Sequence, residues 1–113
     1  MGYWVYLARC GDSTIYTGAT TDLKRRIREH NEKTKKGTRY TASHQPVILV
    51  QAWEVSSWSD ALRLEAAIKK CNRVKKEMLV ENAEAIYTLA KLRELNFHIQ
   101  FVANLVIKEK DTF

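Results

Sequence analysis

Two tyrosines, an arginine and a histidine occur early in the chain, in an order that could place them at one site. Tyr6 and Tyr16 lie in two short apolar runs, and Arg26 and His30 follow four residues apart in a stretch of helical character. Residues four apart share one face of an α-helix. Phenol and imidazole groups transfer protons, and a guanidinium can hold two oxygens of a phosphate. These residue types therefore indicate hydrolysis of a phosphate ester.

A fifth candidate is Glu65, which intrudes on the apolar side of a predicted helix. The apolar stripe of that helix consists of Ala61, Leu64, Ile68 and Cys71. A carboxylate on this side is costly unless it is paired or bound to a cation. Lys69 and Arg63 are the candidate ion-pair partners. The alternative is a divalent cation, and a single hard oxygen ligand with several waters fits Mg²⁺ or Mn²⁺.

Together these residues resemble the motifs of the GIY-YIG nuclease superfamily. The two tripeptides that name the family correspond to Trp4-Val5-Tyr6, with tryptophan for the glycine, and Tyr16-Thr17-Gly18, with threonine for the isoleucine. The basic helix of the family, with its R-x-x-x-H pattern, corresponds to the segment with Arg26 and His30. Glu65 falls where the family carries a metal-binding glutamate. The resemblance covers residues 3 to 80.

The resemblance implies a metal-dependent endonuclease that hydrolyses DNA phosphodiester bonds, with structure-specific cleavage in repair or recombination as the expected setting. The implied catalytic residues are Tyr6, Tyr16, Arg26, His30 and Glu65, with Glu65 as the ligand of Mg²⁺ or Mn²⁺ and Gly18 in a structural role. Gly18 is expected to let a backbone approach closely, because it has no side chain.

Tyr6 is the expected general base, with His30 or Lys24 helping to accept or release the proton. Tyr16 would orient water or phosphate, and Arg26 would steady the non-bridging oxygens. Because the ordinary pKa of tyrosine is near 10, a base role for Tyr6 requires neighbouring cations to lower that pKa.

The later part of the motif departs from the family pattern. Small family members carry an arginine just after a K-Y-T-like segment, whereas Tyr40-Thr41 is followed here by Ala42. The asparagine that often follows the glutamate helix has no clear counterpart, because Asn72 comes early while Lys75 and Lys76 fall nearer to the expected place. Either a lysine takes over that role or the site is incomplete.

Positive charge is concentrated beside the candidate site. The chain has 19 lysines and arginines against 13 acidic residues, for a formal charge of +6. Thirteen of the basic residues fall in two clusters, at 24–39 and 69–76. The clusters are either solvated helix faces or phosphate contacts, and beside this motif phosphate contact is the better interpretation. The expected DNA contacts are Lys24, Arg25, Arg28, Lys35, Lys36, Arg39, Lys69, Lys70, Arg73, Lys75 and Lys76.

Length and cysteine content limit the class of protein. At 113 residues the chain is expected to form one domain, too short for a nuclease domain plus a separate recognition domain. Cys10 and Cys71 form no C-x-x-C pattern, and no secretory segment is evident, so we expect an intracellular protein, cytoplasmic or nucleoid-associated. No apolar run approaches the roughly 20 residues that cross a bilayer.

Periodicity predicts an α+β sandwich with a small, mainly antiparallel, three-stranded sheet flanked by helices. The expected elements are strands 3–9 and 14–17 around a turn at 11–13, helix 23–31, loop 32–38, strand 47–54, helix 60–71 capped by Ser57 or Ser59, a short helix from 74, and a helix at 82–95. Residues 97–107 fit either an extra strand or a helical extension. Tyr6 and Tyr16 can share a face only if the turn contains an odd number of residues, or if a bulge intervenes.

Residues 1–80 are therefore expected to form the catalytic core, and residues 81–113 a C-terminal extension packed on the same domain. Two other functions remain open. The chain could be a nucleic-acid-binding protein of the same fold without catalysis. It could also be a catalytic subunit whose C-terminal extension binds a protein partner or a second copy of the chain.

Overall fold

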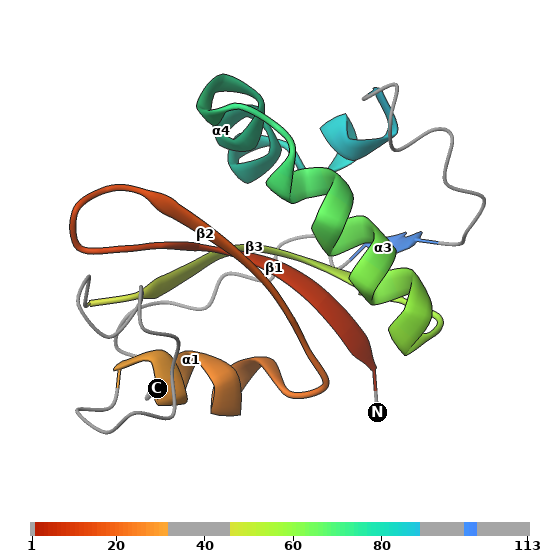
Figure 1. The fold of residues 1–113 in the computed structure, drawn as a ribbon, viewed down its shortest axis with the longest axis horizontal. Coiled ribbons are helices and arrows are strands. Elements are labelled where there is room, and N and C mark those ends of the chain that lie inside the picture. The colour runs from red at the N-terminus through yellow and green to blue at the C-terminus, as the bar shows by residue number, and fades with distance from the viewer. Residues whose placement is uncertain (1, 32–45, 89–98, 102–113) are drawn as a thin grey trace.

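The computed structural model describes residues 2–31, 46–88 and 99–101, which form an antiparallel sheet with helices on both faces (Figure 1). This is the expected α+β sandwich. The elements are β1 (Tyr3–Arg9), β2 (Ile15–Thr20), α1 (Leu23–Asn31), β3 (Ile48–Val55), α3 (Trp58–Lys69), α4 (Arg73–Glu81), the 3₁₀ helix η1 (Ala83–Thr88) and β4 (Ile99–Phe101). Among these residues, no helix has the length and apolar character needed to span a membrane.

The turn between β1 and β2 contains three residues, Gly11-Asp12-Ser13, as the sequence predicts. The Cys10 N–H donates to the Thr14 carbonyl at 2.9 Å, and Ser13 adopts the left-handed conformation at φ 70°. This geometry is typical of three-residue hairpin loops. The Asp12 carboxylate accepts from the backbone N–H and the hydroxyl of Thr14, at 3.1 and 2.6 Å. The odd loop pairs even-numbered residues with even-numbered residues, so Tyr6 lies opposite Gly18 and Ala8 opposite Tyr16.

Because strand side chains alternate, β1 contributes to two separate cores. Its even positions, Tyr6 and Ala8, pack against α1 with Leu23 and Ile27. Its odd positions pack on the opposite face, in a core shared with α3 and α4 that includes Val5, Leu7, Trp53, Leu64 and Ile68. Figure 1 shows α1 on one side of the sheet and α3 and α4 on the other. The first helix and the glutamate helix thus flank the sheet from opposite sides.

Short polar side chains fix where the helices begin. The Asp22 carboxylate accepts from the Arg25 N–H at 3.1 Å at the start of α1. Ser57, one of the two predicted caps, accepts from the Asp60 N–H at 3.1 Å and starts α3. Asn72 accepts from the Lys75 N–H at 2.9 Å and caps α4. The asparagine that follows the glutamate helix is therefore used as a helix cap.

The C-terminal part differs in detail from the sequence prediction. The helical pattern expected at 82–95 appears as the 3₁₀ helix Ala83–Thr88, whose first carbonyl accepts from the Trp53 indole N–H at 3.1 Å, and residues 89–95 lie outside the described part. Of the two alternatives for residues 97–107, the extra strand is present at Ile99–Phe101. It pairs with β3, so the sheet has four strands in the order β2-β1-β3-β4 instead of three. The predicted loop at 32–38 also lies outside the described residues.

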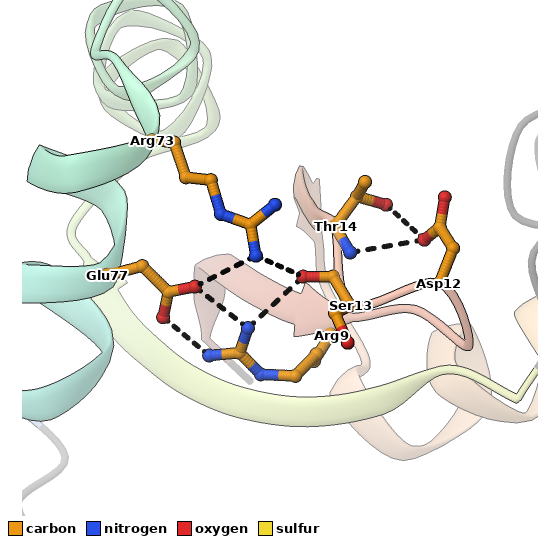
Figure 2. Close-up of polar contacts among 6 residues, drawn as sticks. All are labelled: Arg9, Asp12, Ser13, Thr14, Arg73 and Glu77. Atoms are coloured by element: carbon orange, nitrogen blue, oxygen red, sulfur yellow. Dashed lines mark hydrogen bonds and ion pairs between the residues drawn. The ribbon is translucent and has the colours of Figure 1, made fainter.

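A polar cluster ties the hairpin turn to α4 (Figure 2). The Arg9 guanidinium contacts both oxygens of Glu77, at 2.6 and 2.9 Å, and donates to the Ser13 carbonyl at 3.2 Å. Arg73 donates to the same carbonyl at 3.1 Å and lies 3.6 Å from the Glu77 carboxylate. Hydrogen bonding from Arg9 lowers the pKa of Glu77. Two arginines and one glutamate thus fix the end of the hairpin that carries Tyr16.

Candidate active site

Three aromatic rings meet on the α1 face of the sheet. The ring centroids of Tyr6 and Tyr16 are 6.3 Å apart, those of Tyr6 and His30 6.0 Å, and those of Tyr16 and His30 5.1 Å, the last pair edge to face. The hairpin register brings the two phenols to one face, and the helical position of His30 turns its imidazole toward them. Three of the five predicted catalytic side chains are therefore in mutual contact.

Tyr6 and His30 share a buried hydrogen bond. The hydroxyl oxygen of Tyr6 lies 2.7 Å from Nε2 of His30, and the two residues are 1 % and 0 % exposed. Burial and the charge of Arg26 lower the pKa of His30 to about 4, against a smaller opposing effect of Glu29, which raises it. The imidazole is therefore neutral at neutral pH. Its tautomer decides whether Nε2 accepts from the phenol or donates to it.

The expected lowering of the Tyr6 pKa is not found. Burial raises this pKa above its ordinary value, the nearby Tyr16 and Glu65 raise it further, and Arg26 opposes the rise without overcoming it. Desolvation disfavours the phenolate more than one neighbouring cation favours it. Tyr6 thus favours its protonated form at neutral pH.

Arg26 connects this buried pair to the surface. Its guanidinium interacts with the Tyr6 hydroxyl and donates from Nη1 to Glu29 Oε1 at 2.9 Å. Burial works against the charge, but the hydrogen bond to Glu29 and the proximity of Tyr6 raise the pKa of Arg26. The Arg26 side chain is 25 % exposed, so it is partly accessible to solvent.

Glu65 lies on α3, which packs against the other face of the sheet. Its carboxylate is close enough to Tyr6 to raise the phenol pKa, and its side chain is 19 % exposed. Lys69 Nζ lies 3.5 Å from Oε2, so one of the two anticipated ion-pair partners is present. Arg63 pairs instead with Asp60, at 3.8 Å. Within the described part of the chain, no three His, Cys, Asp or Glu side chains cluster as metal ligands.

Gly18 is needed for a reason that differs from the predicted one. The motif predicts that a backbone approaches this glycine, but the phenol ring of Tyr6 lies over it instead. A Cβ at this position would collide with the hydroxyl and ring carbons of Tyr6. The glycine of the second motif therefore makes room for the tyrosine of the first.

The predicted DNA contacts are distributed over two faces. Lys24, Arg25 and Arg28 are exposed on α1, whereas Lys69 and Lys70 are exposed at the end of α3. On α4, Lys75 is exposed and Lys76 is half-buried, while Arg73 is exposed but engaged with Glu77 and Ser13 (Figure 2). The remaining three predicted contacts lie outside the described residues; they are Lys35, Lys36 and Arg39. Ala42 also lies outside the described residues.

Two polar residues were missed from the sequence: Glu29 beside Arg26, and Thr17 on the other face of β2, opposite Leu7. Glu29 contacts Arg26 and lies 3.9 Å from Arg25, and its spacing of three and four residues from them was the available signal. Thr17 is buried, and within the described residues its hydroxyl has no hydrogen-bond partner. Nothing in its sequence context distinguished Thr17 from an ordinary strand threonine.

A family model described as the GIY-YIG catalytic domain matches residues 2–77 of this chain. This span contains the five predicted catalytic residues and ends within α4. It also agrees with the extent of the resemblance found from the motifs.

Several bacterial proteins are similar in sequence over the same region. The UPF0213 protein DP2720 of Desulfotalea psychrophila is 44% identical over 82 residues, which cover 73% of this chain and 74% of that protein. The UPF0213 protein YazA of Bacillus subtilis is 36% identical over 92 residues, 78% of this chain and 91% of that protein. The solution NMR structure of the UPF0213 protein BH0048 from Bacillus halodurans is 37% identical, covers 87% of this chain and 100% of that one, and has a TM-score of 0.48.

Proposed function

The chain belongs to the GIY-YIG family, and on this premise we propose that it is an endonuclease that hydrolyses phosphodiester bonds of DNA. The observation that carries the proposal is the buried Tyr6–His30 hydrogen bond beside the Arg26 guanidinium. It joins two proton-transfer groups to a cation suited to phosphate.

In the proposed reaction, a water molecule attacks phosphorus in line with the oxygen that leaves. The water passes its proton to the hydroxyl oxygen of Tyr6, while the proton of Tyr6 moves to Nε2 of His30. The bond between phosphorus and the leaving oxygen breaks, that oxygen takes up a proton from solvent, and His30 releases its proton to solvent. The products are a phosphate monoester and a free hydroxyl. Tyr6 thus acts as a relay that stays protonated, as its raised pKa favours.

Substrate binding supports His30 as the proton acceptor. The charge of Arg26 is the second cause of the low His30 pKa, after burial. A phosphate bound to Arg26 offsets that charge and so raises the basicity of the imidazole when it is needed. Arg26 then stabilises the charge that builds up on the non-bridging oxygens, and Tyr16, in contact with both rings, orients water or phosphate.

The site fits a divalent cation that is held largely by the substrate. Glu65 offers one partly exposed carboxylate whose nearest cation, Lys69, is 3.5 Å away. One carboxylate with waters and phosphate oxygens is the usual donor set of Mg²⁺, and Mn²⁺ accepts the same ligands. Glu65 would hold the ion, which would supply Lewis-acid stabilisation of the leaving oxygen.

The proposed substrate class follows from the charge of the chain and its placement. The formal charge of +6 and the exposed lysines and arginines of α1, α3 and α4 support binding to a DNA backbone. Contacts to the phosphate backbone carry no sequence information by themselves. We therefore propose selection by DNA shape, as in the cleavage of branched or damaged structures during repair or recombination.

The test is cleavage of labelled single-stranded, duplex, flapped and four-way-branched DNA in the presence of Mg²⁺ or Mn²⁺. Tyr6→Phe and Glu65→Gln are compared with matched controls that make the same chemical change away from the site. Tyr3→Phe changes a tyrosine of β1 on the opposite face, and Glu81→Gln changes an exposed glutamate of α4.

We expect the wild type and both controls to cut at least one of the four DNA structures, and Tyr6→Phe and Glu65→Gln to lose about 100-fold or more of the rate. Binding without cleavage by the wild type, with either metal, would identify a non-catalytic nucleic-acid-binding protein. Equal cleavage by Tyr6→Phe and Tyr3→Phe would overturn the assignment of the site.

A further inference from the structure

Glu29 places a carboxylate beside Arg26, at the solvent-exposed end of the candidate site. It precedes His30 on α1, and its Oε1 accepts from Arg26 Nη1 at 2.9 Å. Its Oε2 lies 3.9 Å from Nε of Arg25. The Glu29 side chain is 24 % exposed, close to the 25 % of Arg26, so both members of the pair are partly accessible to solvent.

This placement gives Glu29 two opposing effects on a phosphate. A guanidinium has five N–H donors, and the hydrogen bond from one of them to Glu29 fixes the orientation of the others. Because Arg26 also interacts with the Tyr6 hydroxyl, the carboxylate holds the guanidinium beside the proton relay. The same carboxylate repels a phosphate and neutralises part of the charge that would attract it.

We propose that Glu29 positions Arg26 beside Tyr6 before substrate binds. We also propose that the negative charge of Glu29 weakens binding of the DNA backbone in the enzyme–substrate complex. The inference rests on the proposed function, because it takes Arg26 as the phosphate-binding group. Glu29 is a positioning residue that acts through Arg26. Glu29 therefore orders the site before DNA binds, and it lowers the affinity for DNA.

The two effects can be separated by two substitutions. Glu29→Gln removes the charge but keeps an oxygen that can accept from Arg26, whereas Glu29→Ala removes both. Glu81→Gln is the matched control, because it changes the net charge by the same amount at an exposed position at the end of α4. Any affinity gained merely through greater positive charge appears in this control as well.

Binding is measured by fluorescence anisotropy of a labelled duplex with a chelator present, so that no strand is cut. We expect Glu29→Gln to lower the Kd about fivefold relative to Glu81→Gln, and the difference to shrink as salt is added. In cleavage, Glu29→Ala should lower kcat about tenfold while Glu29→Gln keeps it, because only the glutamine still orients Arg26.

Equal Kd values for Glu29→Gln and Glu81→Gln would overturn the inference and leave the proposed function standing. A wild type that binds DNA but never cuts removes the proposed function, and the Kd comparison then still decides this inference. A wild type that binds no DNA at all removes both. A kcat that falls equally in Glu29→Gln and Glu29→Ala would show that Glu29 does not act by orienting Arg26.

Discussion

Nε2 of His30 lies 2.7 Å from the hydroxyl oxygen of Tyr6, with both side chains buried and both groups neutral at neutral pH. This contact supports a proposal in which Tyr6 and His30 act together, because neither group alone is a strong base. Burial raises the pKa of the phenol and lowers the pKa of the imidazole, so each favours its uncharged form until a phosphate arrives.

The pH dependence of kcat/KM tests this relay. Because His30 in the substrate-free protein has a pKa of about 4, kcat/KM should rise between pH 3 and 5 and then stay level up to pH 9. A pre-formed Tyr6 phenolate would instead give a rate that rises tenfold per pH unit through this range. The measurement is kcat/KM at saturating metal concentration, with Tyr3→Phe as the control that keeps the profile. A continuous rise above pH 6 would contradict the relay.

His30 should also make the stability depend on pH. Its folded pKa of about 4 lies below the ordinary value of 6.5, so the unfolded chain binds a proton over a range in which the folded chain does not. The stabilisation is therefore fully present above pH 6.5 and is lost as the pH falls toward 4, by about 3 kcal/mol. Urea unfolding at pH 7 and pH 4.5 measures the loss. His30→Gln should lose less over this interval than the wild type, and an equal loss would contradict the prediction.

Gly18→Ala should disable the site without unfolding the protein. The added methyl group collides with the phenol of Tyr6, which cannot move freely because it packs against Tyr16 and His30. We expect a loss of about 1–3 kcal/mol of stability from overpacking and a loss of activity from the displaced hydroxyl. Ala19→Gly, at the next position of β2, is the control for strand propensity. Full activity in Gly18→Ala would show that the position of the Tyr6 hydroxyl is unimportant.

Thr17→Val should stabilise the fold. The Thr17 hydroxyl is buried and lacks a hydrogen-bond partner within the described residues, so replacing it by a methyl group of similar size removes a desolvation cost of about 1 kcal/mol. Thr20→Val is the matched comparison, because the hydroxyl of Thr20 accepts from the Asp22 N–H at 3.1 Å. We expect the melting temperature to rise in the first variant and fall in the second. A fall in both would indicate a partner for Thr17.

Lys69→Gln should tighten metal binding. The Lys69 ammonium lies 3.5 Å from the Glu65 carboxylate and competes with a divalent cation for it. Removing this charge should lower the Mg²⁺ concentration for half-maximal cleavage about threefold at constant ionic strength. Lys70→Gln, at the adjacent position, loses the same charge away from Glu65 and separates this effect from weaker DNA binding. Equal Mg²⁺ dependence in the two variants would place the ion away from Glu65.

The sequence by itself determined which strands and helices carry the candidate residues. The three-residue turn fixed the register of Tyr6 and Tyr16, because strand alternation leaves one answer for a given loop length. The helical spacing of Arg26 and His30 likewise placed both on the sheet-facing side of α1. These features are local, so residue spacing and turn chemistry are sufficient to predict them.

Tertiary structure alone decided the protonation states and the partners. The pKa of Tyr6 depends on burial by elements that are distant in the sequence. Residue spacing predicted neighbouring cations that would lower this pKa, whereas desolvation raises it. The role of Gly18 depends on the ring across the hairpin, and the choice of Lys69 over Arg63 as the partner of Glu65 depends on how α3 lies on the sheet. The clamp formed by Arg9 and Glu77 joins residues 68 positions apart, a contact that no local pattern predicts.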